Sequence, residues 1–215
     1  MIKTIYRRQI FEMSNMADVE LAARQSFYFK GFDGEDPALI SSILPFYDHR
    51  VSLFNNNNQA VQFCILVYDE ELNGSTYENG FAAAFVQFLK YLEIDQVIMV
   101  QDLCRTWDEF GFNTNEDRIQ FKKLVGFETG TNGLLLDHSS LAEILPLLFY
   151  NNPDEGDCSF YTLSSDFQLC ILYWKGNLHT LFYEKDLAEL SAAAKEAKLL
   201  MGDRELAFNY RYGNR

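Results

Sequence analysis

The sequence lacks the features of membrane and secreted proteins. No stretch reaches the roughly 18 consecutive apolar residues of a membrane-spanning helix. The first twenty residues, MIKTIYRRQIFEMSNMADVE, contain basic side chains but no apolar run of the kind a secretory signal needs. We therefore expect a cytoplasmic protein without a membrane partner. In that compartment the sequence Asn73-Gly74-Ser75 predicts an Asn-Gly turn rather than a glycosylation site.

Metal-binding and redox motifs are also missing. The four cysteines, at positions 64, 104, 158 and 170, form no CxxC pair, and a scaffold of disulfides would need more of them. None of the three histidines, at 49, 138 and 179, stands in ligand spacing with another His or Cys. We predict structural thiols, no metal site and no cofactor.

A glycine cluster at 126–133 resembles a phosphate loop only in its glycine content. It has no Gly-Lys-Ser/Thr ending to place a cation on the phosphates, and Glu128 lies inside it. We interpret it as a connector.

Apolar and aromatic side chains are abundant. Hydrophobic residues make up 48% of the 215 positions, with 19 Phe and 12 Tyr. A chain of this length can bury about 70% of the surface that it exposes when unfolded. The composition predicts a globular protein with a core of packed aromatic rings.

The net charge of −13 is concentrated in the middle of the chain. Residues 31–160 contain 6 basic and 21 acidic side chains, a net −15, whereas residues 1–30 carry +2 and residues 161–215 are neutral. A negative field repels phosphate backbones and anionic membranes, and it attracts a basic protein. The alternative is that the acidic residues keep an aromatic-rich protein in solution.

Two segments of the chain resemble each other. A shift of 106 positions aligns 62–84 with 168–190 and gives 8 identities in 23 positions, among them Cys64 with Cys170 and Leu72 with Leu178. A shift of 101 aligns Asp36 with Asp137. We interpret this as a diverged tandem duplication.

Periodicity predicts an α+β fold of two diverged tandem copies, each reading helix, antiparallel strands, helix, strand. In the first copy we expect a central strand at 59–68, a solvated acidic loop at 69–71, a buried helix at 77–92 and a strand at 95–101. In the second we expect a helix from Asp137, strands at 158–163, 168–174 and 177–183, a helix at 186–201 ended by Gly202, and a strand at 205–210. The domains are an N-terminal extension (1–35), the first repeat (36–102), a helical and Gly-rich connector (103–136) and the second repeat (137–215).

The predicted binding surface consists of acidic turns. The copies differ most at the loop after the first shared strand, where Asp69-Glu70-Glu71 aligns with Lys175-Gly176-Asn177. Loops change partner without disturbing a core. The candidate partner-binding residues are Asp33, Glu35, Asp36, Asp69, Glu70, Glu71, Asp154, Glu155 and Asp157.

Evidence for catalysis is slight, and no catalytic residue is assigned. Cys104 with His138 is the one nucleophile and base pair that distant parts of the chain offer. Glu78 and Glu184 align with each other at helix starts, where a carboxylate is favoured by the helix dipole. Asp137 fits the cap of the helix that follows it.

Three functional hypotheses remain from the sequence. The first is a non-enzymatic, acidic protein-binding module that sequesters or neutralises a basic partner, in the general manner of toxin-immunity proteins or secretion chaperones. The alternative is a small enzyme or ligand-sensing domain with a pocket between the two repeats. The third is a subunit of a larger assembly, held by exposed C-terminal aromatics at Phe208, Tyr210 and Tyr212.

Overall fold

The computed structural model describes residues 2–5, 61–74, 77–101, 107, 112, 114–126, 133–148, 158–163, 168–174 and 177–202. The strands are β1 (Lys3–Ile5), β2 (Val61–Tyr68), β3 (Gln96–Gln101), β4 (Gly133–Asp137), β5 (Cys158–Thr162), β6 (Leu169–Trp174), β7 (Asn177–Tyr183) and β8 (Leu199–Gly202). The helices are α5 (Glu70–Asn73), α6 (Tyr77–Tyr91), α7 (Asn115–Val125), α8 (His138–Ile144) and α9 (Leu187–Glu196), with 3₁₀ helices η2 (Leu145–Leu148) and η3 (Glu184–Asp186).

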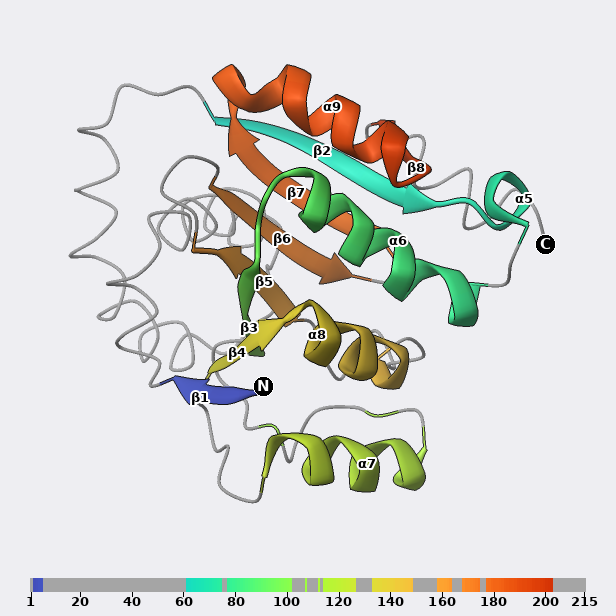
Figure 1. Cartoon of the computed structure of the whole chain (residues 1–215), viewed down its shortest axis with the longest axis vertical. Helices are drawn as coiled ribbons and strands as arrows, with labels where there is room; N and C mark the ends of the chain where they lie inside the picture. The colour runs from blue at the N-terminus through green and yellow to red at the C-terminus, as the bar shows by residue number, and fades with distance from the viewer. Residues whose placement is uncertain are drawn as a thin grey trace, which may run out of the picture.

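All eight strands join one antiparallel sheet in the order β1-β4-β3-β5-β6-β7-β2-β8. Figure 1 shows α6, α8 and α9 side by side over one face of this sheet, with α7 beyond the end where β1 lies. The predicted α+β class with antiparallel strands is confirmed. The meander of β5, β6 and β7 and the interior position of β2 are confirmed as well.

The sheet contains two split β-α-β units. β4 and β5 are both antiparallel to β3, so they run in the same direction, and α8 connects them across β3. In the same way β7 and β8 are antiparallel to β2 and are connected by α9 across it. Since α8 and α9 cover the same face, both crossovers have the same hand, as the twist of β-strands requires.

The core under the helices is built on the aromatic side chains of α6. Phe81, Phe85 and Phe88 recur along one face of the helix, and each is 0% exposed. Phe85 meets Phe160 of β5 edge to face, with ring centroids 5.4 Å apart. The predicted aromatic core and the burial of this helix against the sheet are confirmed.

The opposite face of the sheet is also buried. Ile98, Tyr161 and Cys170 belong to one apolar cluster on that face, and Ile65 and Val67 to another. An antiparallel sheet commonly leaves one face in water, whereas strands buried on both faces read as continuous apolar runs. The segments CILVY in β2 and VIMV in β3 are such runs.

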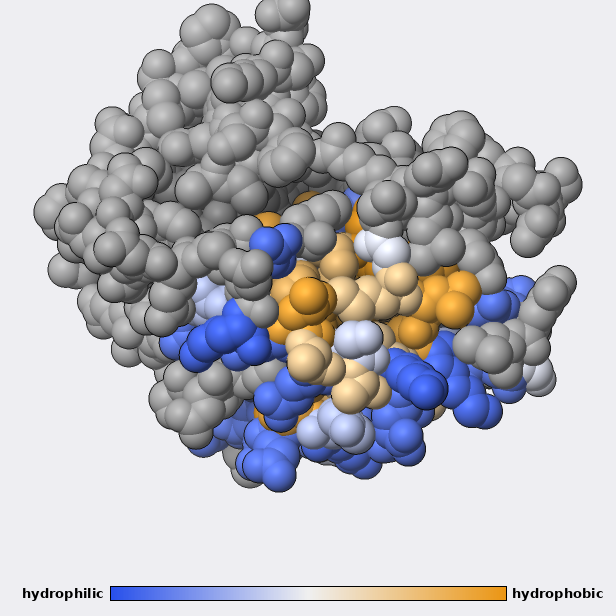
Figure 2. All heavy atoms as spheres, turned by 90° about the horizontal axis from the view of Figure 1, so that it is seen from above, coloured by the Kyte–Doolittle hydropathy of each residue, from blue (hydrophilic) through white to orange (hydrophobic). Residues whose placement is uncertain are grey.

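The α9 end of the sheet has apolar side chains at its described surface. Figure 2 looks down on this end, where apolar side chains occupy the middle of the described surface and hydrophilic ones border it. Leu187, in the first turn of α9, is 44% exposed, while Leu190 one turn later is 0% exposed. Tyr91, the last residue of α6, is 44% exposed as well.

Two strands differ from the sequence prediction. The segment Gly133–Asp137, assigned to the connector, forms β4 in the interior of the sheet. The predicted helix 186–201 ends at Glu196 because Lys198 adopts a positive φ of 56°, and Leu199–Gly202 then forms β8. Gly202 therefore ends a strand and not a helix.

The tandem duplication is not confirmed. Cys64 lies in the core under the helices, whereas its aligned residue Cys170 lies on the opposite face of the sheet. Side chains alternate along a strand. The other residues of β2 and β6 that the shift of 106 aligns therefore also point to opposite faces of the sheet. Further on, Leu72 lies in helix α5 while Leu178 lies in strand β7. The identities thus do not mark equivalent positions.

Strands of both predicted repeats share the sheet. β2 and β3 come from 36–102, β4 from 103–136 and β5 to β8 from 137–215. The boundaries stay a prediction, since 6–60 and 203–215 lie outside the described residues. The elements predicted there, including the strand at 205–210 and the aromatics Phe208, Tyr210 and Tyr212, lie outside them too.

Asp137 begins α8 as predicted. Its Oδ1 accepts hydrogen bonds from the Ser140 backbone N–H at 2.9 Å and from the Ser139 hydroxyl at 2.8 Å. Hydrogen bonds from the amino terminus of the chain, from Ser140 and from Ser139 lower the pKa of this carboxyl. A carboxyl whose pKa is lowered in the folded state stabilises the fold at pH values above its ordinary pKa. This stabilisation is lost as the pH falls through the lowered pKa.

Replacing Asp137 by alanine is expected to lower the free energy of unfolding by about 1 kcal/mol at neutral pH, because α8 loses its capping acceptor. Urea unfolding measures the change. Asp137→Ser keeps a capping oxygen and should recover most of the loss; equal losses in both variants would contradict the capping role.

Candidate functional site

The acidic turn, defined here as Asp69, Glu70 and Glu71, follows β2 directly. Glu70 and Glu71 open the short helix α5, so the predicted loop is in part a helical turn. Figure 1 shows α5 at one extremity of the molecule, just beyond the end of β2. Asp69 is half-buried and the Glu70 side chain is exposed.

Hydrogen bonds from Asn73 hold the backbone of the acidic turn. Its Nδ2 donates to the carbonyl oxygen of Asp69 at 2.8 Å and to that of Lys198 at 3.1 Å. Gly74 then closes the turn with a positive φ of 66°, where glycine costs little, and its N–H donates to the Glu70 carbonyl at 2.8 Å. The predicted Asn-Gly turn is present, as the end of a helix, and the Asn73 amide is occupied within the fold.

Glu70 has a structural role in addition to its charge. Its Oε1 accepts a hydrogen bond, 2.6 Å long, from the backbone N–H of Tyr77. Tyr77 is the first residue of α6. A carboxylate at this place satisfies one of the open N–H groups and is favoured by the helix dipole. The Tyr77 ring stacks on Phe81 at 5.1 Å and meets Tyr68 edge to face at 5.4 Å. The acidic turn is therefore fixed to the aromatic core at both ends.

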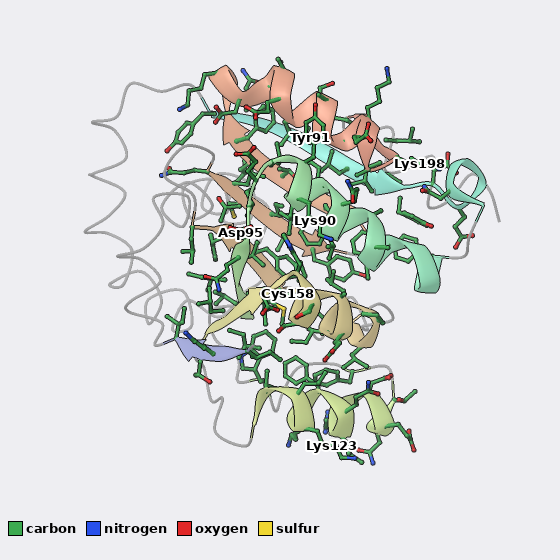
Figure 3. The ribbon with its side chains drawn as sticks, in the orientation of Figure 1. Lys90, Tyr91, Asp95, Lys123, Cys158 and Lys198 are labelled. Carbon is green, nitrogen blue, oxygen red and sulfur yellow. The ribbon has the colours of Figure 1, made fainter. Side chains whose placement is uncertain are left out.

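The described segment that contains the acidic turn is acidic in sequence. The described segment 61–74 contains three acidic residues and no basic one. Lys198 is the nearby basic residue whose position the structure gives: it lies at the turn from α9 to β8, on the side of the molecule where α5 lies (Figure 3). The described segment 61–74 thus has a net charge of −3, and its attraction of a basic partner stays a prediction.

The other two predicted acidic turns lie outside the described residues. They contain Asp33, Glu35, Asp36, Asp154, Glu155 and Asp157. Their convergence with the acidic turn on one face stays a prediction.

Three of the residues considered for catalysis lie within the described part of the chain: His138, Glu78 and Glu184. His138 Nε2 lies 2.8 Å from the carbonyl oxygen of Ile94, so this nitrogen carries the proton that it donates. Glu78 lies in the first turn of α6, at a helix start as predicted, and Glu184 opens η3 before α9. Cys104 lies outside the described residues, so its predicted pairing with His138 stays untested.

Three of the described cysteines are buried and form no disulfide, in keeping with the prediction of structural thiols: Cys64, Cys158 and Cys170. Burial raises the pKa of the Cys64 thiol to about 12. A thiol with so high a pKa stays protonated near neutral pH and is a poor nucleophile. Cys158 lies under the helices (Figure 3) and Cys170 on the other face, so the sheet separates them.

The glycine cluster begins with the end of α7. Thr114 and Asp117 form a capping box at the start of this helix, as predicted from its sequence. Gly126 ends it with a φ of 85°, and its N–H donates to the Lys122 carbonyl at 3.0 Å. Gly133 already belongs to β4, so within the glycine cluster 126–133 only residues 127–132 lie outside the described residues.

Within the described ranges, no cluster of three or more His, Cys, Asp or Glu side chains is arranged to hold a metal ion. No helix there is long and apolar enough to cross a membrane. Comparison with protein-family models, curated proteins and solved structures gave no match.

Proposed function

We propose that this chain is a non-enzymatic, acidic protein-binding module of the cytoplasm that sequesters or neutralises a basic partner protein. The observation that carries the proposal is the acidic turn, three consecutive acidic residues whose backbone is held by Asn73 and by the hydrogen bond from the start of α6 to Glu70. The excess of acidic residues in 31–160 supports it, since the surrounding field has the same sign.

A fixed acidic turn favours association in two ways. A backbone that is already ordered loses little conformational entropy when a partner binds. Clustered negative charge steers a positively charged protein toward the site and raises the association rate, most strongly at low ionic strength. Toxin-immunity proteins and secretion chaperones are functional types that share small size, acidity and α+β composition with this chain.

The test is charge reversal within the acidic turn, with Glu70 left in place because it caps α6. The partner is first captured from the native host and identified together with the products of adjacent genes. Asp69→Lys combined with Glu71→Lys is then expected to reduce the association rate about tenfold or more at low salt, with a smaller effect on dissociation. Stopped-flow mixing at several salt concentrations measures both rates.

Glu143→Lys is the matched control, since this side chain is exposed on α8 and lies outside the acidic turn. It should change the association rate much less than the double variant. An association rate that the double variant leaves unchanged at low salt would remove the acidic turn from the interface. Capture of a partner that is not basic would contradict the proposed function itself.

A further inference from the structure

Two helices that pack on the sheet are preceded by an aspartate, and the two aspartates have opposite surroundings. Asp137 lies before α8 with an extended backbone, ψ 174°, and its carboxylate accepts the hydrogen bonds of a cap. Asp186 lies before α9 with a helical backbone, φ −93° and ψ 0°, and makes no side-chain hydrogen bond to the helix. A capping side chain normally needs the extended conformation to reach back to the first turn. Asp186 is therefore not a cap.

The carboxylate of Asp186 is buried without compensation. The residue is 8% exposed, and its Oδ2 is buried with no hydrogen-bond partner. Its Oδ1 lies 3.9 Å from Lys185 Nζ, at the limit of an ion pair, and the Lys185 side chain is 58% exposed. Such a solvated pair offsets little of the cost of removing a carboxylate from water.

The charges around Asp186 do not balance this cost. Burial raises the pKa of its carboxyl, Lys185 lowers it, and Glu189, one turn along α9, raises it again. β8, which packs against α9, has no titratable side chain. The other titratable residues on α6, β7 and η3 are Tyr77, Glu78, Lys90 and Tyr91 of α6, of which Figure 3 labels the last two, His179 and Tyr183 of β7, and Glu184 of η3, with Glu93 just after α6.

We propose that Asp186 makes the docking of α9 on the sheet depend on pH, tight when this carboxyl is protonated and looser when it is ionised. The protonated carboxyl can stay buried at modest cost, whereas the ionised one is favoured by any opening that brings water to Oδ2. α9 also positions β8, which pairs with β2, and the Lys198 carbonyl, which accepts a hydrogen bond from Asn73, the residue that holds the backbone of the acidic turn. Opening of α9 thus reaches the end of the sheet and the acidic turn together.

The sign follows from the raised pKa. A carboxyl that binds its proton more tightly in the folded state stabilises docking fully below its ordinary pKa of 3.8. This stabilisation is lost as the pH rises through the higher, folded value. Asp137 has the opposite sign, because its pKa is lowered. Acidification from neutral pH therefore tightens α9.

Hydrogen–deuterium exchange of the full chain tests the proposal. At neutral pH, Asp186→Ala is expected to slow exchange of the α9 amides about fivefold or more, because a buried unsatisfied group is removed. The matched variant Asp137→Ala should accelerate exchange in α8 about fivefold, since a true cap is lost. Asp186→Asn removes the charge with almost the same shape, and it decides the sign should the alanine variant fail to fold.

The pH dependence provides the second readout. In the wild type, α9 exchange corrected for the intrinsic amide rate should increase from about pH 4 upward and then level off, whereas both Asp186 variants should show no such increase. Dilute solution is required, because the pI is near 4.6. Faster or unchanged α9 exchange in the Asp186 variants, or a pH response that persists in them, would overturn the proposal.

Discussion

Replacing Phe85 by alanine is expected to destabilise the protein by about 3–5 kcal/mol, the range for deleting a fully buried aromatic ring. Phe85 is 0% exposed and lies at the centre of α6. Its ring centroid is 6.1 Å from that of Phe81, 6.4 Å from that of Phe88 and 5.4 Å from that of Phe160. The variant loses the apolar transfer energy and leaves a cavity bounded by rings that pack against other neighbours as well.

Urea unfolding followed by circular dichroism measures this loss. Gln87→Ala is the matched control, because Gln87 is exposed on the same helix and alanine is a good helix former. The control should stay within about 0.5 kcal/mol of the wild type. A loss below about 1 kcal/mol for Phe85→Ala would mean that α6 does not hold the sheet as described.

The second large effect is expected on the other face of the sheet. Ile98→Ala should cost about 2–5 kcal/mol, as for other buried aliphatic residues. Ile98 is 0% exposed in the interior strand β3, opposite Leu135 of β4 and Tyr161 of β5. Its side chain belongs to the cluster that faces away from α6, α8 and α9.

The conservative variant Ile98→Val serves as the control. It removes one methylene and should cost only about 0.5–1.5 kcal/mol. A solvated sheet face would tolerate both substitutions almost equally well. Near-equal stabilities of the two variants would therefore contradict the burial of the second face.

Long apolar patterns made much of this fold predictable from sequence. The runs in β2 and β3 indicate interior strands, and the spacing of Phe81, Phe85 and Phe88 indicates a helix against a sheet. The structure confirms all three. Thr114 and Asp137 were also predictable as caps, because their short side chains carry an oxygen that can accept a hydrogen bond from a backbone N–H of the first turn.

The errors have local physical causes. Leu134, Leu135 and Leu136 favour helices as strongly as strands, so β4 gave no distinct signal between a glycine cluster and a helix cap. α9 ends at Glu196, and Lys198 then adopts a positive φ although it is not glycine, so no Gly or Asn in the sequence marks this helix end. The tandem repeat is not confirmed, because residues that are identical in the alignment, such as Cys64 and Cys170, lie on opposite faces of the sheet.

The candidate site was predictable in composition but not in construction. The acidic residues 69–71 are evident from sequence. The roles of Glu70 at Tyr77 and of Asn73 at Lys198 depend on contacts across the fold, the second between residues 125 positions apart. Asp186 resembled an ordinary helix cap, and only its backbone conformation and burial distinguish it from Asp137.

The split arrangement of the sheet also constrains biosynthesis. β2 pairs with β7 and β8, and β3 pairs with β4 and β5, so every sheet partner of these two strands is translated after them. During translation, the apolar segment from β2 through α6 to β3 is synthesised before the strands that pair with β2 and β3. Pairing between strands that are far apart in the sequence slows folding, and it leaves apolar surface exposed until the partner strands have been synthesised. The sheet around β2 can be completed only once Gly202 has been synthesised.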